Sequence, residues 1–139
     1  MTALNQQEKE TFLSELHVGV LSVPQDGRGP LTAPIWYCYA PGESLRIMIG
    51  RDSRKAGLLE VGTRVSLCAQ NEEPPYSYVT AEGPVESVRP GTDEDILELA
   101  TRYLGEEDGK AYAESMPTGA SLTVTIRPET WLAVDYSRR

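Results

Sequence analysis

Residues 44–70 form the segment SLRIMIGRDSRKAGLLEVGTRVSLCAQ, in which two strand-like runs flank a short helical one. SLRIMIG at its start and TRVSLCAQ at its end have the alternating apolar residues of β-strands. Between them, Ser53 is a good N-cap for a short helix that Gly62 closes. One short helix within a series of antiparallel strands favours a small β-barrel with external helices over a parallel βαβ sheet.

The sequence on both sides of this segment supports an all-antiparallel barrel. We expect six strands, at 17–24, 30–41, 44–50, 63–70, 76–88 and 121–136. Pro34 lies inside the second of these and marks an edge, a bulge or a bend, because proline cannot donate to a strand ladder. Capping signals predict helices at 5–16 and from Thr92 to Leu104, and 105–120 gives a weaker helix and a loop. The predicted fold is mostly β with flanking helices, a six-stranded antiparallel split β-barrel.

Length and composition limit the possible functions. The 139 residues suit a single domain, 1–139, with one core, and the net charge of -8 disfavours nucleic acid or anionic lipid as a partner. No apolar stretch approaches the roughly 18 residues of a membrane span, and the polar N-terminus has no signal-peptide core. Cys38 and Cys68 lie in apolar runs, which indicates buried thiols in a cytoplasmic protein, and no residue set suggests a metal.

A local basic cluster contrasts with this acidic background. Cations at a helix start oppose the helix dipole, so stability alone does not explain Arg51, Arg54 and Lys55 around Ser53. Backbone amides at a helix start bind phosphate, and an arginine or lysine adds a charge-assisted hydrogen bond. The alternative is a capped helix with solvated cations.

At this point the sequence resembles the pyridoxamine 5'-phosphate oxidase-like family of split β-barrels. The matching runs are RDSRKAGLLE, VGTRVSLCAQ and YVTAEGPVE, and the resemblance covers roughly residues 8 to 135. In that family a Ser-Arg-Lys segment after the third strand grips a flavin phosphate. The family's His-Asp-Arg segment for pyridoxal phosphate is absent, since the chain ends in WLAVDYSRR, and we therefore reject vitamin B6 oxidation as the activity.

The resemblance implies a cofactor site with two parts. The phosphate would be held by Ser53, Arg54 and Lys55. Ring and ribityl contacts would come from Pro34, Ile35, Trp36, Ile49 and Gly50, with Gln70 close by. Tyr78 falls where flavin-binding members often have a ring-contacting glutamine, a departure from the usual FMN mode. Trp36 is equally well explained as a core residue.

A branch of this superfamily uses the deazaflavin coenzyme F420, and PIWY, EGPVE and RYLG are similar to it. The anionic lactyl phosphate and polyglutamate tail of F420 suit Arg51, Arg54, Lys55 and Arg64, although the phosphate of FMN would suit them too. The resemblance implies a homodimeric F420-dependent oxidoreductase that transfers a hydride to or from an unsaturated small molecule. The alternatives are an FMN-binding oxidoreductase or flavin reductase and a non-catalytic flavin or tetrapyrrole binder.

Other aromatic side chains are candidates for completing the site. In related barrels the partner subunit contributes to the pocket, and Tyr76, Tyr78 or Trp131 could do so here. Tyr37, Tyr39, Tyr76, Tyr78 and His17 are possible proton donors, as is solvent. His17 follows the first predicted helix, where a histidine is more often a helix-end residue than a catalyst. The stripe Ile96, Leu99 and Tyr103 is expected to pack.

Overall fold

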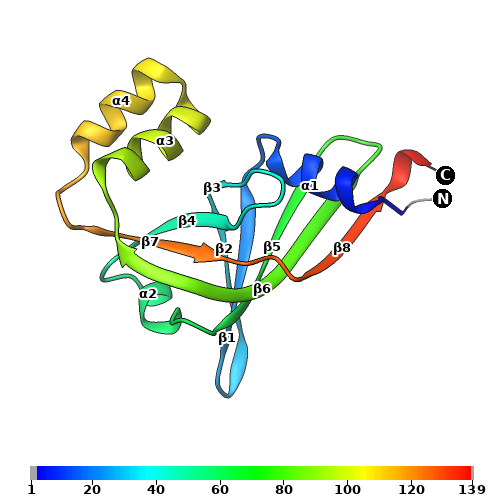
Figure 1. Ribbon diagram of the computed structural model, residues 1–139, viewed down its shortest axis with the longest axis horizontal. Helices are drawn as coiled ribbons and strands as arrows, with labels where there is room; N and C mark the ends of the chain where they lie inside the picture. The colour runs from blue at the N-terminus through cyan, green and yellow to red at the C-terminus, as the bar shows by residue number, and fades with distance from the viewer. Residues whose placement is uncertain (1–2, 139) are drawn as a thin grey trace.

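The computed structural model describes residues 3–138, in which an antiparallel sheet curls into an open half-barrel with helices around it (Figure 1). The described strands are β1 (Gly19–Gln25), β2 (Arg28–Ile35), β3 (Tyr37–Cys38), β4 (Leu45–Gly50), β5 (Arg64–Asn71), β6 (Ser77–Pro90), β7 (Ser121–Ile126) and β8 (Thr130–Asp135). The helices are α1 (Gln6–Ser14), α2 (Arg54–Leu58), α3 (Asp93–Leu104) and α4 (Glu106–Ser115), followed by the 3-10 turn η1 (Tyr136–Arg138).

The long strand β6 organises the sheet. The strand order is β2-β1-β5-β6-β7-β4-β3, and β8 also pairs with β6. The first part of β6 pairs with β5 and β8, and its last part, from Val85, pairs with β7. One strand therefore joins the two halves of the split barrel, which confirms the predicted fold class.

The strand count corrects the prediction, because two of the six expected strands are each divided in two. The expected strand 30–41 breaks at Trp36, where the amide of Tyr37 donates to the Tyr103 hydroxyl at 3.0 Å. The expected strand 121–136 breaks at Arg127–Glu129, where the chain crosses over β6 at Gly83. Both breaks depend on distant residues, so the local alternation of the sequence does not reveal them.

The crossing at Gly83 requires a glycine. A Cβ atom at this position would lie 1.7 Å from the carbonyl oxygen of Arg127. The crossing segment is held by two backbone hydrogen bonds, from Arg127 N–H to the Pro84 carbonyl at 3.0 Å and from Glu129 N–H to the Glu82 carbonyl at 2.8 Å. The AEG motif thus has a structural role, since only a residue without a side chain lets the link between β7 and β8 pass.

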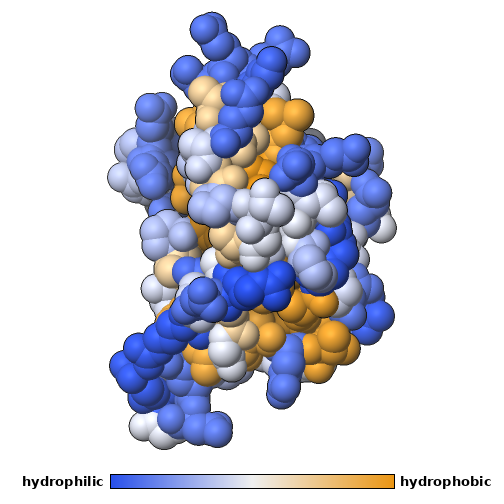
Figure 2. All heavy atoms as spheres, turned by 90° about the vertical axis from the view of Figure 1, so that its left-hand side faces the viewer, coloured by the Kyte–Doolittle hydropathy of each residue, from blue (hydrophilic) through white to orange (hydrophobic). Residues whose placement is uncertain are grey.

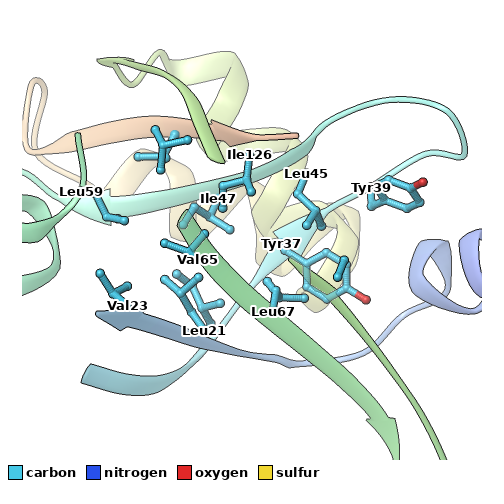
Figure 3. Close-up of a cluster of buried hydrophobic side chains, with 14 of the residues drawn as sticks. Leu21, Val23, Tyr37, Tyr39, Leu45, Ile47, Leu59, Val65, Leu67 and Ile126 are labelled. Atoms are coloured by element: carbon cyan, nitrogen blue, oxygen red, sulfur yellow. The ribbon is translucent and has the colours of Figure 1, made fainter. Parts of the chain in front are cut away.

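Alternating apolar residues of the strands fill the barrel, and Leu21, Ile47, Val65, Leu67 and Ile126 meet there (Figure 3). Helix α1 adds Leu13, which is fully buried. The Tyr37 hydroxyl donates to the Leu13 carbonyl at 2.7 Å, so α1 is tied to β3 as well as packed on the core. Burial of each such side chain contributes about 1.5–3 kcal/mol, which makes the core the main source of stability.

Helices α3 and α4 form a hairpin between β6 and β7 and lie beside the sheet near β7 and β4 (Figure 1). The predicted capping box of Thr92 and Asp95 starts α3. The Asp95 carboxylate also binds the Arg89 guanidinium at 2.7 and 3.1 Å and the Thr123 hydroxyl at 2.9 Å, which fixes α3 to the sheet. In α4, a Cβ atom on Gly109 would lie 2.7 Å from the Thr101 Cα, so α4 approaches α3 closely.

Candidate functional site

Within the described residues 3–138, three basic side chains around the start of α2 have no acidic partner. Arg51, Arg54 and Lys55 make no ion pair within residues 3–138, although the chain has 21 Asp and Glu against 13 Lys and Arg. The arginines that do pair with carboxylates are Arg46, Arg64, Arg89, Arg127 and Arg138. We call Arg51, Arg54 and Lys55 the cationic corner, and their unpaired charges suit an anionic ligand. Arg64, a further sequence candidate, is bound to Glu129 at 2.8 Å.

Ser53 shapes this corner as a helix cap. Its hydroxyl accepts from the Ala56 amide at 3.3 Å and donates to the Gly50 carbonyl at 2.7 Å. The hydroxyl hydrogen is therefore already used within the protein. The first-turn amides of Arg54 and Lys55 have no backbone acceptor inside α2 and stay available to an anion.

The corner is anchored to two neighbouring segments. The backbone amide of Arg51 donates to the Ala120 carbonyl at 2.8 Å, and its Nε donates to the Gly119 carbonyl at 2.9 Å. Arg54 donates to the side-chain oxygen of Gln25, at the end of β1, at 2.7 Å. The side-chain amino group of Lys55 has no hydrogen-bond partner in the part of the chain described, so it is the least committed of the three.

A cavity of about 400 Å³ lies next to the corner, between β4 and the α3–α4 hairpin. Its lining residues are Trp36, Met48, Ile49, Gly50, Ile96, Leu99, Ala100, Tyr112, Met116, Ala120 and Ser121. The cavity contains the predicted ring contacts Trp36, Ile49 and Gly50, and Gly50 directly precedes Arg51 in sequence. Figure 2 shows this side of the molecule, where hydrophobic residues are exposed in separate areas among hydrophilic ones.

The three side chains of residues 34–36 lie in three different environments. Pro34 is on β2, an edge strand, as its sequence position indicated. Ile35 is only 9% exposed and belongs to the barrel core. Trp36 lines the cavity and stacks on Tyr103, with ring centroids 4.9 Å apart and an interplanar angle of 6°. Trp36 therefore packs against α3 and also lines the cavity, and its contact with a coenzyme ring stays a prediction.

Gln70, Tyr76 and Tyr78 do not line this cavity. Gln70 and Tyr78 are register partners on β5 and β6, and Tyr76 precedes β6 with 52% exposure. Gln70 is two strands away from the edge strand that carries Pro34, about 10 Å at the usual strand spacing. One chain thus brings together the residues of the corner and the cavity but leaves these three apart from them.

The outward side chains of the sheet form a continuous row across five strands. We call Pro34, Val20, Cys68, Thr80 and Leu132, which are successive register partners, the outer row. The buried residues Leu21, Leu67 and Ala81 alternate with members of this row and face the core instead. Leu132 in this row is 58% exposed. The register partners Gln70 and Tyr78 lie on the same side of the sheet as the outer row.

Most of the candidate proton donors are engaged elsewhere in the protein. Burial raises the pKa of Tyr37 far above its usual value, and its hydroxyl is bound to the Leu13 carbonyl. Burial, with the nearby Glu10 carboxylate, raises the pKa of Tyr39 to about 12. His17 makes a 3.1 Å hydrogen bond to the Phe12 carbonyl, the expected role at the end of α1. Trp131 packs against the core beside Tyr39.

Sequence analysis missed the contribution of α4 to the site. Tyr112 and Met116 line the cavity, and the predicted packing residues Ile96 and Leu99 line it as well. The local sequence contains little sign of this, because Tyr112 is on α4 whereas Met116 is its C-cap residue with extended backbone. Their approach to Trp36 depends on the return of the hairpin to the sheet.

The sequence profile of the pyridoxamine 5'-phosphate oxidase family matches residues 6–135, nearly the whole chain and all of the elements that form the corner and the cavity. The chain belongs to this family. The match establishes the family but not the activity in its name. A search of the curated proteins finds no match.

Solved structures of this family's fold superimpose well at low sequence identity. An F420 reductase has a TM-score of 0.71 at 21% identity, over 88% of this chain and 94% of its own. The conserved hypothetical protein Rv2991 from Mycobacterium tuberculosis has a TM-score of 0.74 at 19% identity, over 97% and 87%. An FAD and heme binding protein from Mycobacterium smegmatis has a TM-score of 0.66 at 14% identity, over 96% and 72%. At these identities the likeness concerns the fold.

Within residues 3–138, no helix of this protein is both long enough and apolar enough to cross a membrane. The longest, α3, has 12 residues.

Proposed function

We propose that this protein is an F420-dependent oxidoreductase that transfers a hydride between the deazaflavin coenzyme and an unsaturated small-molecule acceptor. The supporting observation is that the unpaired cationic corner adjoins an uncharged cavity at the end of β4. Gly50 lines the cavity, and Arg51 of the corner is the next residue. A coenzyme with an anionic tail and an apolar ring needs this combination.

In this proposal each part of the site has a distinct task. Lys55, Arg54 and Arg51 bind the anionic groups, together with the two first-turn amides of α2. Ser53 keeps those amides oriented through its cap, because its hydroxyl oxygen accepts from the Ala56 amide. The ring lies against Pro34, the backbone of Ile35, Trp36 and the Ile49–Gly50 strand end. The bound coenzyme supplies the hydride chemistry, and the protein supplies orientation and field.

The charge of the corner favours F420 over a coenzyme with a single phosphate. F420 carries a lactyl phosphate and a polyglutamate tail, and three unpaired cations exceed the need of one phosphate group. The F420 reductase of the same fold is consistent with this choice. FMN is the alternative, because its phosphate fits the same corner, and the activity would then be that of an FMN-dependent oxidoreductase or flavin reductase.

A non-catalytic flavin or tetrapyrrole binder is the alternative of a different class, and a protein of this fold binds FAD and heme. The one histidine of this chain, His17, is bound to the Phe12 carbonyl and does not line the cavity. This arrangement favours the redox enzyme over a heme protein that uses histidine as its iron ligand.

The proposal includes a homodimer that works in the cytoplasm. The outer row presents apolar and small side chains, with Leu132 well exposed, as a surface for a second copy. Pairing through this surface would let Gln70, Tyr76 and Tyr78 of one copy approach the site of the other. Their distance from the cavity within one chain agrees with such an intersubunit role.

The test is a side-by-side titration with FMN and F420. Loss of two charge-assisted hydrogen bonds, at about 1.5–3 kcal/mol each, should weaken coenzyme binding by the Arg54→Ala/Lys55→Ala variant at least about 100-fold. Arg28→Ala is the matched control, since Arg28 is exposed, lies on β2 and makes no ion pair within residues 3–138. Unchanged affinity for both coenzymes in the double variant would overturn the assignment of the corner, and tighter binding of FMN would overturn the choice of F420.

A further inference from the structure

The side of the cavity under the α3–α4 hairpin has an unusual lack of charge. Ile96 and Leu99 of α3 and Tyr112 and Met116 near α4 form this side, opposite Met48 of β4. The same hairpin carries many carboxylates, with Asp93, Glu94 and Asp95 in the first turn of α3 and Glu106, Glu107 and Asp108 in that of α4. None of these six lines the cavity.

The missing charge limits the kind of ligand that this compartment accepts. An ion that enters an apolar compartment loses its hydration, and no opposite charge there compensates for it. A neutral ligand avoids this cost and gains from burial against Met48, Leu99 and Met116. Methionine side chains also adapt to ligands of different outline, which suits an acceptor that varies in shape.

Polar atoms of the lining define the ligand further. The indole N–H of Trp36 and the hydroxyls of Tyr112 and Ser121 have no hydrogen-bond partner within residues 3–138. All three groups are neutral hydrogen-bond donors, and they belong to residues that line an otherwise apolar space. A neutral ligand with a carbonyl oxygen would satisfy such donors, whereas a plain hydrocarbon would leave them without a partner.

We propose that the α3–α4 side of this cavity is the acceptor site and selects uncharged, compact ligands with a conjugated carbonyl group, and rejects carboxylates. Its role as an acceptor site rests on the function proposed above, because it adjoins the ring contacts Ile49 and Gly50. We assign the binding preference to the lining, and it can be measured without coenzyme in the Arg54→Ala/Lys55→Ala background, so that the neighbouring cationic corner does not attract the carboxylate.

The chain offers a built-in reporter for this measurement. It has two tryptophans, and Trp131→Phe leaves Trp36 of the cavity wall as the sole one. In that background, 9-fluorenone should quench the Trp36 fluorescence saturably, and 9-fluorenone-2-carboxylate should bind at least about tenfold more weakly. Equal or tighter binding of the carboxylate would overturn the proposal, as would an absence of saturable quenching by the ketone.

A charge introduced into the wall tests the location. Met116→Lys should increase affinity for 9-fluorenone-2-carboxylate at least about tenfold, a gain that a folding defect would not produce. Leu97→Lys is the matched control, because Leu97 is 42% exposed on α3 and does not line the cavity. The same response in both variants would place the ligand outside the cavity and overturn the proposal.

The corner variant separates this proposal from the coenzyme assignment. Arg54→Ala/Lys55→Ala should bind 9-fluorenone like the parent, since neither residue lines the cavity. Normal fluorenone binding by a protein that binds neither coenzyme would overturn the proposed function and leave the neutral-ligand preference intact. Loss of fluorenone binding in the folded corner variant would contradict the proposed compartment.

Discussion

Trp36 and Tyr103 lie face to face with their ring centroids 4.9 Å apart, which joins the break between β2 and β3 to helix α3. The Tyr103 hydroxyl continues this connection, since it donates to the His17 carbonyl at 2.6 Å and accepts the Tyr37 amide at 3.0 Å. Stacking of this kind contributes about 0.5–1.5 kcal/mol beyond area burial. The wall of the cavity is therefore held by the same tyrosine that connects the helical hairpin to the barrel.

Removal of the Tyr103 hydroxyl should loosen this wall. Tyr103→Phe keeps the stack but leaves the His17 carbonyl and the Tyr37 amide without that partner, at a cost of about 1–3 kcal/mol. We expect a lower Tm in thermal unfolding followed by circular dichroism. Tyr112→Phe is the control, because the Tyr112 hydroxyl has no partner within residues 3–138, and its Tm should match that of the wild type. Equal losses in the two variants would argue against this role of Tyr103.

A side chain at Gly83 should disturb the chain crossing. Gly83→Ala would place a Cβ atom 1.7 Å from the Arg127 carbonyl oxygen, and the backbone shift that this forces should cost about 3 kcal/mol. Gly57→Ala is the matched control, because a Cβ atom there meets nothing within 4 Å and alanine favours a helix by about 0.5–1 kcal/mol. Urea unfolding of both variants should show opposite signs, and a neutral Gly83→Ala would contradict the crossing.

Acid should remove the contribution of Asp95. The Arg89 guanidinium, together with the Thr92 and Thr123 hydrogen bonds, holds the pKa of Asp95 well below its ordinary value near 4. The unfolded chain therefore takes up the proton first as the pH falls, so this stabilisation is complete above about pH 5 and declines below about pH 4. Asp95→Asn should lower the free energy of unfolding by about 1–3 kcal/mol at neutral pH.

The same substitution has a distinctive pH profile. The gap in Tm between the wild type and Asp95→Asn should be constant from pH 5 to 7 and should narrow below about pH 4. A gap that widens in acid would show that another group, and not the Asp95 carboxylate, controls this region.

A charge on the outer row should dissociate the proposed dimer. Leu132→Glu would bring like charges into the pairing surface from both copies, so we expect a shift to monomer in size-exclusion chromatography with light scattering. Val61→Glu adds the same charge at a 67% exposed position outside the sheet and should leave the mass unchanged. A Leu132→Glu variant that keeps the wild-type dimer mass would exclude this surface as the interface.

Local signals in the sequence predicted the starts of the helices well. Asn5 and Thr92 start helices through the expected capping boxes, and Ser53 caps α2. The predicted end of α2 at Gly62 was wrong, because the helix stops at Leu58 with Leu59 as its C-cap, and Gly62 belongs to the following turn, where its φ of 95° favours glycine. Pro34 marks an edge strand because its missing N–H is tolerated there. Each confirmed feature depends on a few neighbouring residues, so a single sequence contains the whole signal.

Features produced by distant contacts were not predictable in this way. The break at Trp36 depends on Tyr103, and the crossing at Gly83 depends on Arg127, so the strand count came out as six instead of eight. The basic residues of the corner are adjacent in sequence and could be recognised. The cavity beside it combines β4 with a helix that follows about 60 residues later, and no local pattern connects Met48 with Tyr112.

Strands β6 and β7 are direct neighbours in the sheet, so the α3–α4 hairpin is an excursion that leaves the barrel and comes back to the adjoining strand. In the functions proposed above, the helical side of the acceptor site and the coenzyme-binding corner therefore come from separate stretches of the chain. Grafting residues 91–120 from another family member onto this barrel should exchange the range of molecules reduced and preserve the coenzyme. Such a division would let substrate choice diversify by mutation in one stretch while selection maintains the other.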